Sequence, residues 1–152
     1  MSAEENLKKL NINLPKAPDP VGAYVASKIV GNLVFISGQL PLNSEGKLIK
    51  GKVGKELNLE QGQEAAKLCA LNLLAQLKKI SGSLDKVKGC VKITGYVNSI
   101  DSFVDQPKVI NGASDLIASV FGEAGMHTRA AVSTNSLPLG VSVEVDAIFE
   151  LN

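Results

Sequence analysis

The chain has 152 residues, a net charge of +1 and 45% hydrophobic residues, which suits one globular domain with a sizeable core. The near-neutral charge and the low aromatic content argue against a nucleic-acid-binding surface. A single histidine, and two cysteines (Cys69 and Cys90) without metal-ligand spacing, argue against a metal site and favour reduced core thiols. Glu4 and Glu5 near the start, and the lack of a long apolar stretch, favour a soluble cytoplasmic protein without a signal peptide.

Turn and capping residues predict a single α+β domain of order β-β-α-β-α-β-β, in which residues 1–19 form an N-terminal extension. Ser2 and Asn58 stand where helix caps are expected, and Gly31-Asn32 suits the turn of a hairpin. A polar excursion separates the hairpin from the long helix. In chain order, we expect a helix over 2–10, strands over 24–30 and 33–39, the excursion over 43–57, a helix over 58–80, a strand over 87–97, a helix opened by Pro107, and two strands joined through 137–140.

Two apolar stripes predict that both long helices lie on one face of a mixed sheet. The first stripe leaves Asn72 and Gln76 on its polar side, and alternation places Val91 on the buried face of the strand over 87–97. Nothing in the sequence covers the other sheet face, and oligomerisation would solve this. The second stripe consists of Val109, Ile110, Ala113, Leu116, Ile117 and Val120.

Arg129 is the only arginine among sixteen lysine and arginine residues, and it follows the only histidine, His127, by two residues. Its planar fork of donors matches a carboxylate in a way that lysine cannot copy. Arg129 is therefore our candidate for an anion-binding side chain, although most arginines are simply solvated. His127 has no evident carboxylate partner, which favours a structural or solvated histidine over a catalytic one.

The final strand pair, read as a hairpin, places Ser133 opposite Glu144. Arg129 shares the strand parity of Ser133, so Glu144 would face the same side as Arg129, about 13 Å away at the backbone. This spacing suits a groove that holds a small ligand between two long side chains. The alternative is that Glu144 is a solvated strand residue.

The pair Ser37-Gly38 ends an apolar strand and exposes backbone N–H groups that suit a carboxylate oxygen, although most such pairs only end strands. No Gly-x-Ser-x-Gly frame surrounds Ser37, which argues against a serine hydrolase. No phosphate-binding or dinucleotide-binding loop is present either.

Two segments, Phe35-Ile-Ser-Gly-Gln-Leu-Pro41 and Leu137-Pro-Leu-Gly-Val-Ser-Val-Glu-Val-Asp-Ala-Ile148, resemble the Rid/YjgF family, also labelled L-PSP endoribonuclease. Arg129 lies between them, and the resemblance covers residues 20–150 in the same order. It implies a chorismate-mutase-like fold. It also implies a homotrimer in which the sheets form an internal barrel, with the helices outside and three clefts between subunits.

Family members of the deaminase type hydrolyse 2-imino or enamine acids to 2-keto acids and ammonia, and need no metal or cofactor. The resemblance implies that Arg129 grips the substrate carboxylate and that Glu144 positions or activates the water. It further implies that Tyr24, Ser37, Gly38 and Asn111 border the cleft.

Two departures mark a divergent subgroup. Ala131 stands at a binding position where many deaminase members carry a cysteine, and Gly22-Ala-Tyr24 replaces Gly-Pro-Tyr. Three functions therefore remain open: an imine or enamine deaminase, a non-catalytic binder of small carboxylates, and a ribonuclease. The low positive charge and few aromatic residues argue against the ribonuclease.

Overall fold

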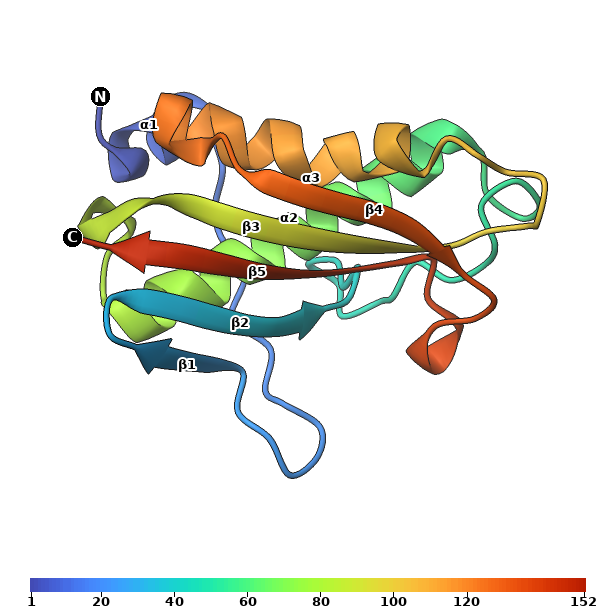
Figure 1. Cartoon of the computed structure of the whole chain (residues 1–152), viewed down its shortest axis with the longest axis horizontal. Helices are drawn as coiled ribbons and strands as arrows, with labels where there is room; N and C mark the ends of the chain where they lie inside the picture. The colour runs from blue at the N-terminus through green and yellow to red at the C-terminus, as the bar shows by residue number, and fades with distance from the viewer.

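The computed structural model describes all 152 residues and shows an α+β domain in which helices cover one face of a five-stranded sheet (Figure 1). Three short 3₁₀ turns connect some of the elements, and the element order confirms the predicted one. In chain order, the helices and strands are α1 (Ala3–Lys9), β1 (Ser27–Val30), β2 (Leu33–Gln39), α2 (Leu59–Ser81), β3 (Val87–Asn98), α3 (Gln106–Phe121), β4 (Thr128–Thr134) and β5 (Val143–Leu151).

The strand β5 lies in the middle of the sheet, whose order is β1-β2-β5-β3-β4. It pairs antiparallel with β2 on one side and with β3 on the other, while β4 pairs parallel with β3. The prediction of a β4–β5 hairpin is therefore wrong. The chain passes from β3 through α3 to β4, and such a helical crossover makes the two strands parallel neighbours.

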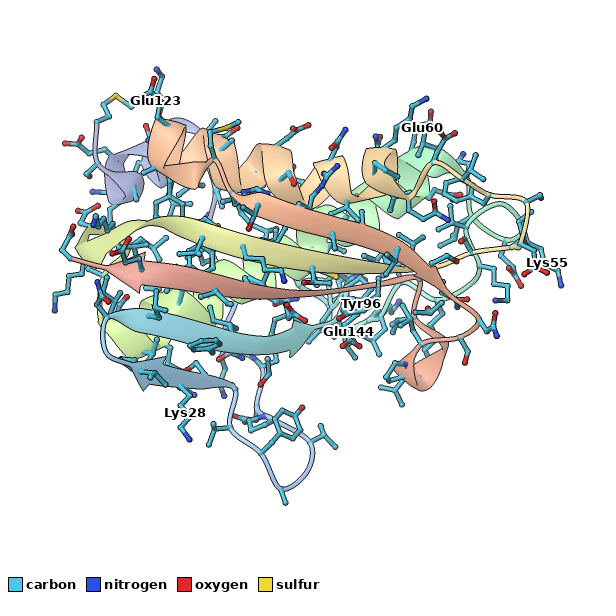
Figure 2. All side chains as sticks on the ribbon, viewed as in Figure 1. Lys28, Lys55, Glu60, Tyr96, Glu123 and Glu144 are labelled. Atoms are coloured by element: carbon cyan, nitrogen blue, oxygen red, sulfur yellow. The ribbon has the colours of Figure 1, made fainter.

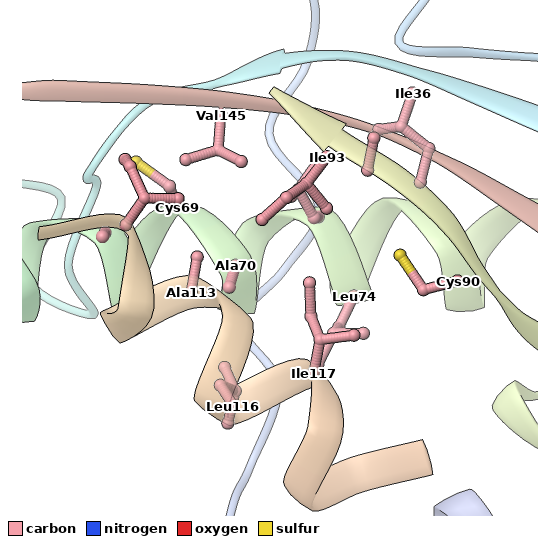
Figure 3. Close-up of a cluster of buried hydrophobic side chains, with 14 of the residues drawn as sticks. Ile36, Cys69, Ala70, Leu74, Cys90, Ile93, Ala113, Leu116, Ile117 and Val145 are labelled. Atoms are coloured by element: carbon pink, nitrogen blue, oxygen red, sulfur yellow. The ribbon is translucent and has the colours of Figure 1, made fainter. Parts of the chain in front are cut away.

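The helices begin and end within one residue of the predicted bounds. Asn58 caps α2 and forms a capping box with Gln61, and Gly82 ends the helix. Pro107 lies in the first turn of α3, and its six stripe residues are all buried. Figure 3 shows side chains of both helices packed against the sheet. The labelled core residues are Ile36, Cys69, Ala70, Leu74, Cys90, Ile93, Ala113, Leu116, Ile117 and Val145.

Two details of the predicted burial are wrong. Asn72 and Gln76 are buried, because their amides bond to backbone carbonyls of segments that cross α2. Val91 is exposed and Cys90 is buried. A register shift between Cys90 and Lys92 changes which residues of β3 face the helices.

The other face of the sheet is uncovered and carries exposed apolar side chains. Val30, Phe35 and Val132 keep 56%, 42% and 46% of their surface exposed there. No helix combines the length and the apolar character needed to span a bilayer. Exposed apolar side chains on an open sheet face are a feature that an assembly of several copies would cover.

We expect the chain to form a homotrimer through this open face. Light scattering at micromolar concentration should give about three times the 15.9 kDa mass of one chain. The variant Phe35→Glu should shift the mass towards one chain, whereas Lys55→Glu, in the 43–57 loop, should not. A monomeric mass for the parent protein would contradict the prediction.

Candidate functional site

Glu144 lies on the open face of the sheet and lines a pocket of about 750 Å³. It pairs with Tyr96 of β3, and Figure 2 shows the two labelled side chains together near the ends of their strands. The pocket wall is mostly apolar, as is usual for small-molecule sites. Besides Glu144, the wall includes Tyr24, Ser37, Gly38, Leu42 and Leu139. The structure therefore brings together four of the predicted site residues: Tyr24, Ser37, Gly38 and Glu144.

The strand β2 bulges at Ser37 and Gly38, because two residues there face one residue of β5. The Glu144 side chain lies directly over the Gly38 backbone, where any Cβ atom would overlap the carboxylate. Glycine at position 38 is thus what allows the carboxylate to occupy this place. The Ser37 hydroxyl donates to the Val25 carbonyl at 2.7 Å and fixes the segment next to Tyr24.

Burial raises the pKa of the half-buried Glu144 carboxyl above its ordinary value, and the nearby Asp146 carboxylate adds to this effect. Burial also raises the pKa of Asp146, against the opposing influence of Lys92 and Thr94. A carboxyl with a raised pKa is the usual form of a general acid or base that works near neutral pH.

Buried amides hold the segments that form the pocket wall. The Asn72 amide donates to the carbonyls of Leu40 and Leu42, at 3.1 and 3.2 Å. The Gln76 amide donates to the Pro18 carbonyl at 2.5 Å. These two α2 side chains fix the chain on both sides of the bulge that carries Gly38.

The loop over residues 43–57 supports the turn that supplies Leu139. The Gly51 N–H donates to the Gly140 carbonyl at 3.0 Å, and the Lys52 ammonium donates to the Asn98 side chain at 2.8 Å and to the Asn135 carbonyl. These hydrogen bonds hold the loop over residues 43–57 against the turn that forms one wall of the pocket.

Arg129 lies on β4, at the edge of the sheet beside α3. Its Nη1 donates to Asn111 Oδ1 at 2.7 Å and to Ser114 Oγ at 3.2 Å. The other two guanidinium nitrogens, Nε and Nη2, donate to no protein group, and no carboxylate lies within salt-bridge distance. An exposed guanidinium that is held from one side can donate its remaining N–H groups to an anion in a bidentate contact.

The structure does not bring Arg129 and Glu144 together within one chain. Arg129 pairs with Ile93, which is buried under the helices, whereas Glu144 pairs with Tyr96 on the open face. Their backbones are roughly 14 Å apart, given the strand and residue spacings of a sheet. The prediction that both face one groove is wrong, because β3 separates β4 from β5 and the register differs from that of a hairpin.

The remaining predicted site residues, Asn111 and Ala131, both lie with Arg129 and not at the Glu144 pocket. Asn111 lies inside α3 and contacts Arg129. Ala131 pairs with Gly95 and packs against the core on the same side of β4 as Arg129.

The two cysteines, Cys69 and Cys90, are buried and form no disulfide, and burial raises the pKa of the Cys90 thiol to about 12. Neither thiol is poised as a nucleophile.

Sequence reasoning missed Ser114. Its hydroxyl lies between Arg129 and His127, with His127 Nε2 at 2.9 Å. Its helical position one turn after Asn111 was visible in the sequence, since residues i and i+3 share a helix face. What was missing was the placement of β4 along α3.

Comparisons with known proteins agree with this fold. The sequence model of the family described as "YjgF/chorismate mutase-like, putative endoribonuclease" matches residues 4–151. Protein TCP17 of Trypanosoma cruzi is 48% identical over 97% of this chain and 92% of its own length. A 2-iminobutanoate/2-iminopropanoate deaminase of Rattus norvegicus is 29% identical over 90% of this chain and 86% of its own. The crystal structure of the protein Atu1372, of unknown function, from Agrobacterium tumefaciens is 47% identical, with a TM-score of 0.89 over 99% of this chain and 94% of that one.

The raised pKa of Glu144 predicts a stability effect of Glu144→Gln. Folding favours the protonated carboxyl, so its contribution to stability is complete below the unfolded pKa and is lost as the pH rises through the folded pKa. Glutamine avoids this loss, so the variant should have a larger free energy of unfolding than the parent at neutral pH. The difference should close below pH ~4.

Urea unfolding at a fixed protein concentration and several pH values measures this effect. The control is Glu123→Gln, an exposed carboxylate in the turn after α3, which should bring no such gain. Equal stability of parent and Glu144→Gln at neutral pH would contradict the prediction.

Proposed function

Because the chain belongs to the YjgF/chorismate-mutase-like family, we propose that it hydrolyses small 2-imino and enamine acids to 2-keto acids and ammonia. The observation that carries the proposal is the complementary chemistry of two half-sites. One half-site offers the free guanidinium donors of Arg129, which suit a substrate carboxylate. The other offers the half-buried Glu144 carboxylate in an apolar pocket, which suits the activation of water.

Two copies of the chain would complete one site. Arg129 and Glu144 lie on opposite sides of the same sheet, so a small substrate cannot touch both within one copy. In the proposed trimer, the Arg129 edge of one subunit meets the Glu144 pocket of the next. Closure by a second copy would also exclude bulk water, which strengthens both interactions.

The proposed reaction needs little from the protein beyond positioning. Arg129 holds the carboxylate so that the imine carbon faces the Glu144 pocket. Glu144 takes a proton from water while the water oxygen bonds to the imine carbon, and the electron pair of the C=N bond moves to nitrogen. The protonated Glu144 returns its proton to the nitrogen, which gives a carbinolamine. Glu144 then takes the proton of the new hydroxyl group and passes it to the amino nitrogen, so that the carbonyl forms as the C–N bond breaks and ammonia leaves.

The rat relative supports this reading, since it is named as a deaminase of 2-iminobutanoate and 2-iminopropanoate. A non-catalytic binder of small carboxylates would use the same Arg129 donors, and ammonia release from freshly generated 2-iminobutyrate separates the two functions. Ammonia release above the spontaneous rate supports the deaminase. Binding of 2-ketobutyrate without any acceleration would favour the binder. Acceptance of RNA as a substrate would contradict both.

We expect Arg129→Lys to lose most carboxylate affinity while the fold stays intact. The charge remains, but the bidentate fork does not, and the loss should be about 2–5 kcal/mol. Calorimetric titration with 2-ketobutyrate measures the effect, and Lys108→Arg, which adds a fork on exposed α3, is the control. Unchanged affinity in Arg129→Lys would exclude Arg129 as the clamp.

Glu144→Gln should reduce turnover by about 10²–10⁴-fold, with a smaller effect on binding, because the amide keeps the shape but cannot accept a proton. In the parent, kcat/KM should fall as the pH drops through the raised pKa of Glu144, since only the ionised carboxylate acts as the base. A weakened affinity with an unchanged rate would instead make Glu144 a binding residue.

A further inference from the structure

The only histidine and the only arginine of the chain are joined through one serine hydroxyl. Ser114 Oγ lies 2.9 Å from His127 Nε2 and accepts from Arg129 Nη1 at 3.2 Å. Ser114 and His127 are half-buried, while Arg129 is exposed. The network therefore joins two half-buried side chains to a charged group at the surface.

The direction of each hydrogen bond follows from a backbone carbonyl. His127 Nδ1 lies 2.6 Å from the Gly125 carbonyl oxygen, which can only accept, so Nδ1 carries the proton. In the neutral ring, Nε2 is then an acceptor, and the Ser114 hydroxyl donates to it. This leaves the lone pairs of Ser114 Oγ facing Arg129.

The carbonyl that sets this direction is itself fixed. Gly125 packs so closely against α3 that a Cβ there would come within 2.6 Å of the Ile117 carbonyl oxygen. The turn after α3 is thus pressed onto the helix, and the carbonyl that orients His127 cannot move without unpacking it.

The consequence for Arg129 is that both hydrogens of Nη1 have a fixed acceptor. One goes to Asn111 Oδ1 at 2.7 Å and the other to Ser114 Oγ. With Nη1 held on both sides, the guanidinium plane is set, while Nε and Nη2 have no hydrogen-bond partner within the chain. A fork held in this way loses less conformational entropy when it binds a planar anion.

We infer that Ser114 and His127 are positioning residues which set the orientation of the Arg129 fork and thereby the affinity of the site for a carboxylate. The inference rests on the proposed role of Arg129 as the carboxylate clamp. The simpler reading is that the Ser114–His127 contact only fastens the turn after α3 to the helix.

A binding experiment separates these readings. Ser114→Ala should bind 2-ketobutyrate about tenfold more weakly than the parent, as expected for one lost hydrogen bond to a charged group. Ser114→Thr keeps the hydroxyl and should retain most of the affinity. The matched control is Ser119→Ala on the same helix, whose hydroxyl only donates to the Asp115 carbonyl at 2.8 Å and should leave binding unchanged.

Coupling between the two residues is the second readout. His127→Ala should weaken the binding of 2-ketobutyrate. The double variant Ser114→Ala/His127→Ala should bind it no more weakly than the single variant with the lower affinity, because both residues act through one network. Additive losses would contradict the inference. Arg129→Lys, measured in parallel, separates the two levels of the argument. If it keeps full affinity, the clamp itself is wrong. If it loses affinity while Ser114→Ala matches Ser119→Ala, only the positioning role is wrong.

Nitrogen NMR gives a readout that a merely structural contact would not move. With one arginine and one histidine, both side chains give signals that need no assignment. The parent should show the Nδ1-protonated tautomer of His127 and slow rotation of the Arg129 guanidinium, and Ser114→Ala should speed that rotation while Ser119→Ala does not. An Nε2-protonated tautomer in the parent, or equal rotation rates in the variants, would overturn the inference.

Discussion

The position of β5 in the centre of the sheet is the constraint on which the rest of the molecule depends. Its backbone is hydrogen-bonded on both sides, to β2 and to β3, so it joins the N-terminal hairpin to the β3–α3–β4 unit. The same placement sets the chemistry. It puts Glu144 on the open face next to the β2 bulge, and it leaves β4 at the far edge, where Arg129 lies along α3. One sheet thus presents two incomplete half-sites.

The sequence predicted the elements well because each has a local signal. The caps at Ser2 and Asn58, the hairpin turn at Gly31-Asn32 and the α3 stripe depend on neighbouring residues only. Strand pairing depends on which distant segment offers a partner, and the short turn at residues 137–140 favoured the wrong one. The buried Asn72 and Gln76 were missed for a related reason, since their acceptors belong to segments at least thirty positions away.

The candidate site shows the same division. Arg129 stood out by its uniqueness, Glu144 by the assumed hairpin pairing and Ser37-Gly38 as the end of an apolar strand, and the family resemblance pointed to all of them. The structure gives each a setting that suits its expected chemistry. Their arrangement did not follow from the sequence, because it depends on the sheet order. Ser114 carries no signal of its own in the sequence, since one more serine on a helix is ordinary. Only the contact with both His127 and Arg129 distinguishes it.

The amide anchors of the pocket wall have a consequence for how the protein responds to its solution. Asn72 and Gln76 hold Leu40, Leu42 and Pro18 through groups that do not ionise. A change of pH that alters the protonation of Glu144 therefore leaves these hydrogen bonds in place. We also expect these two anchors to respond little to ionic strength, because no salt bridge takes part in them. The pocket keeps its shape while the charge inside it changes, so charge and geometry are set by separate parts of the chain.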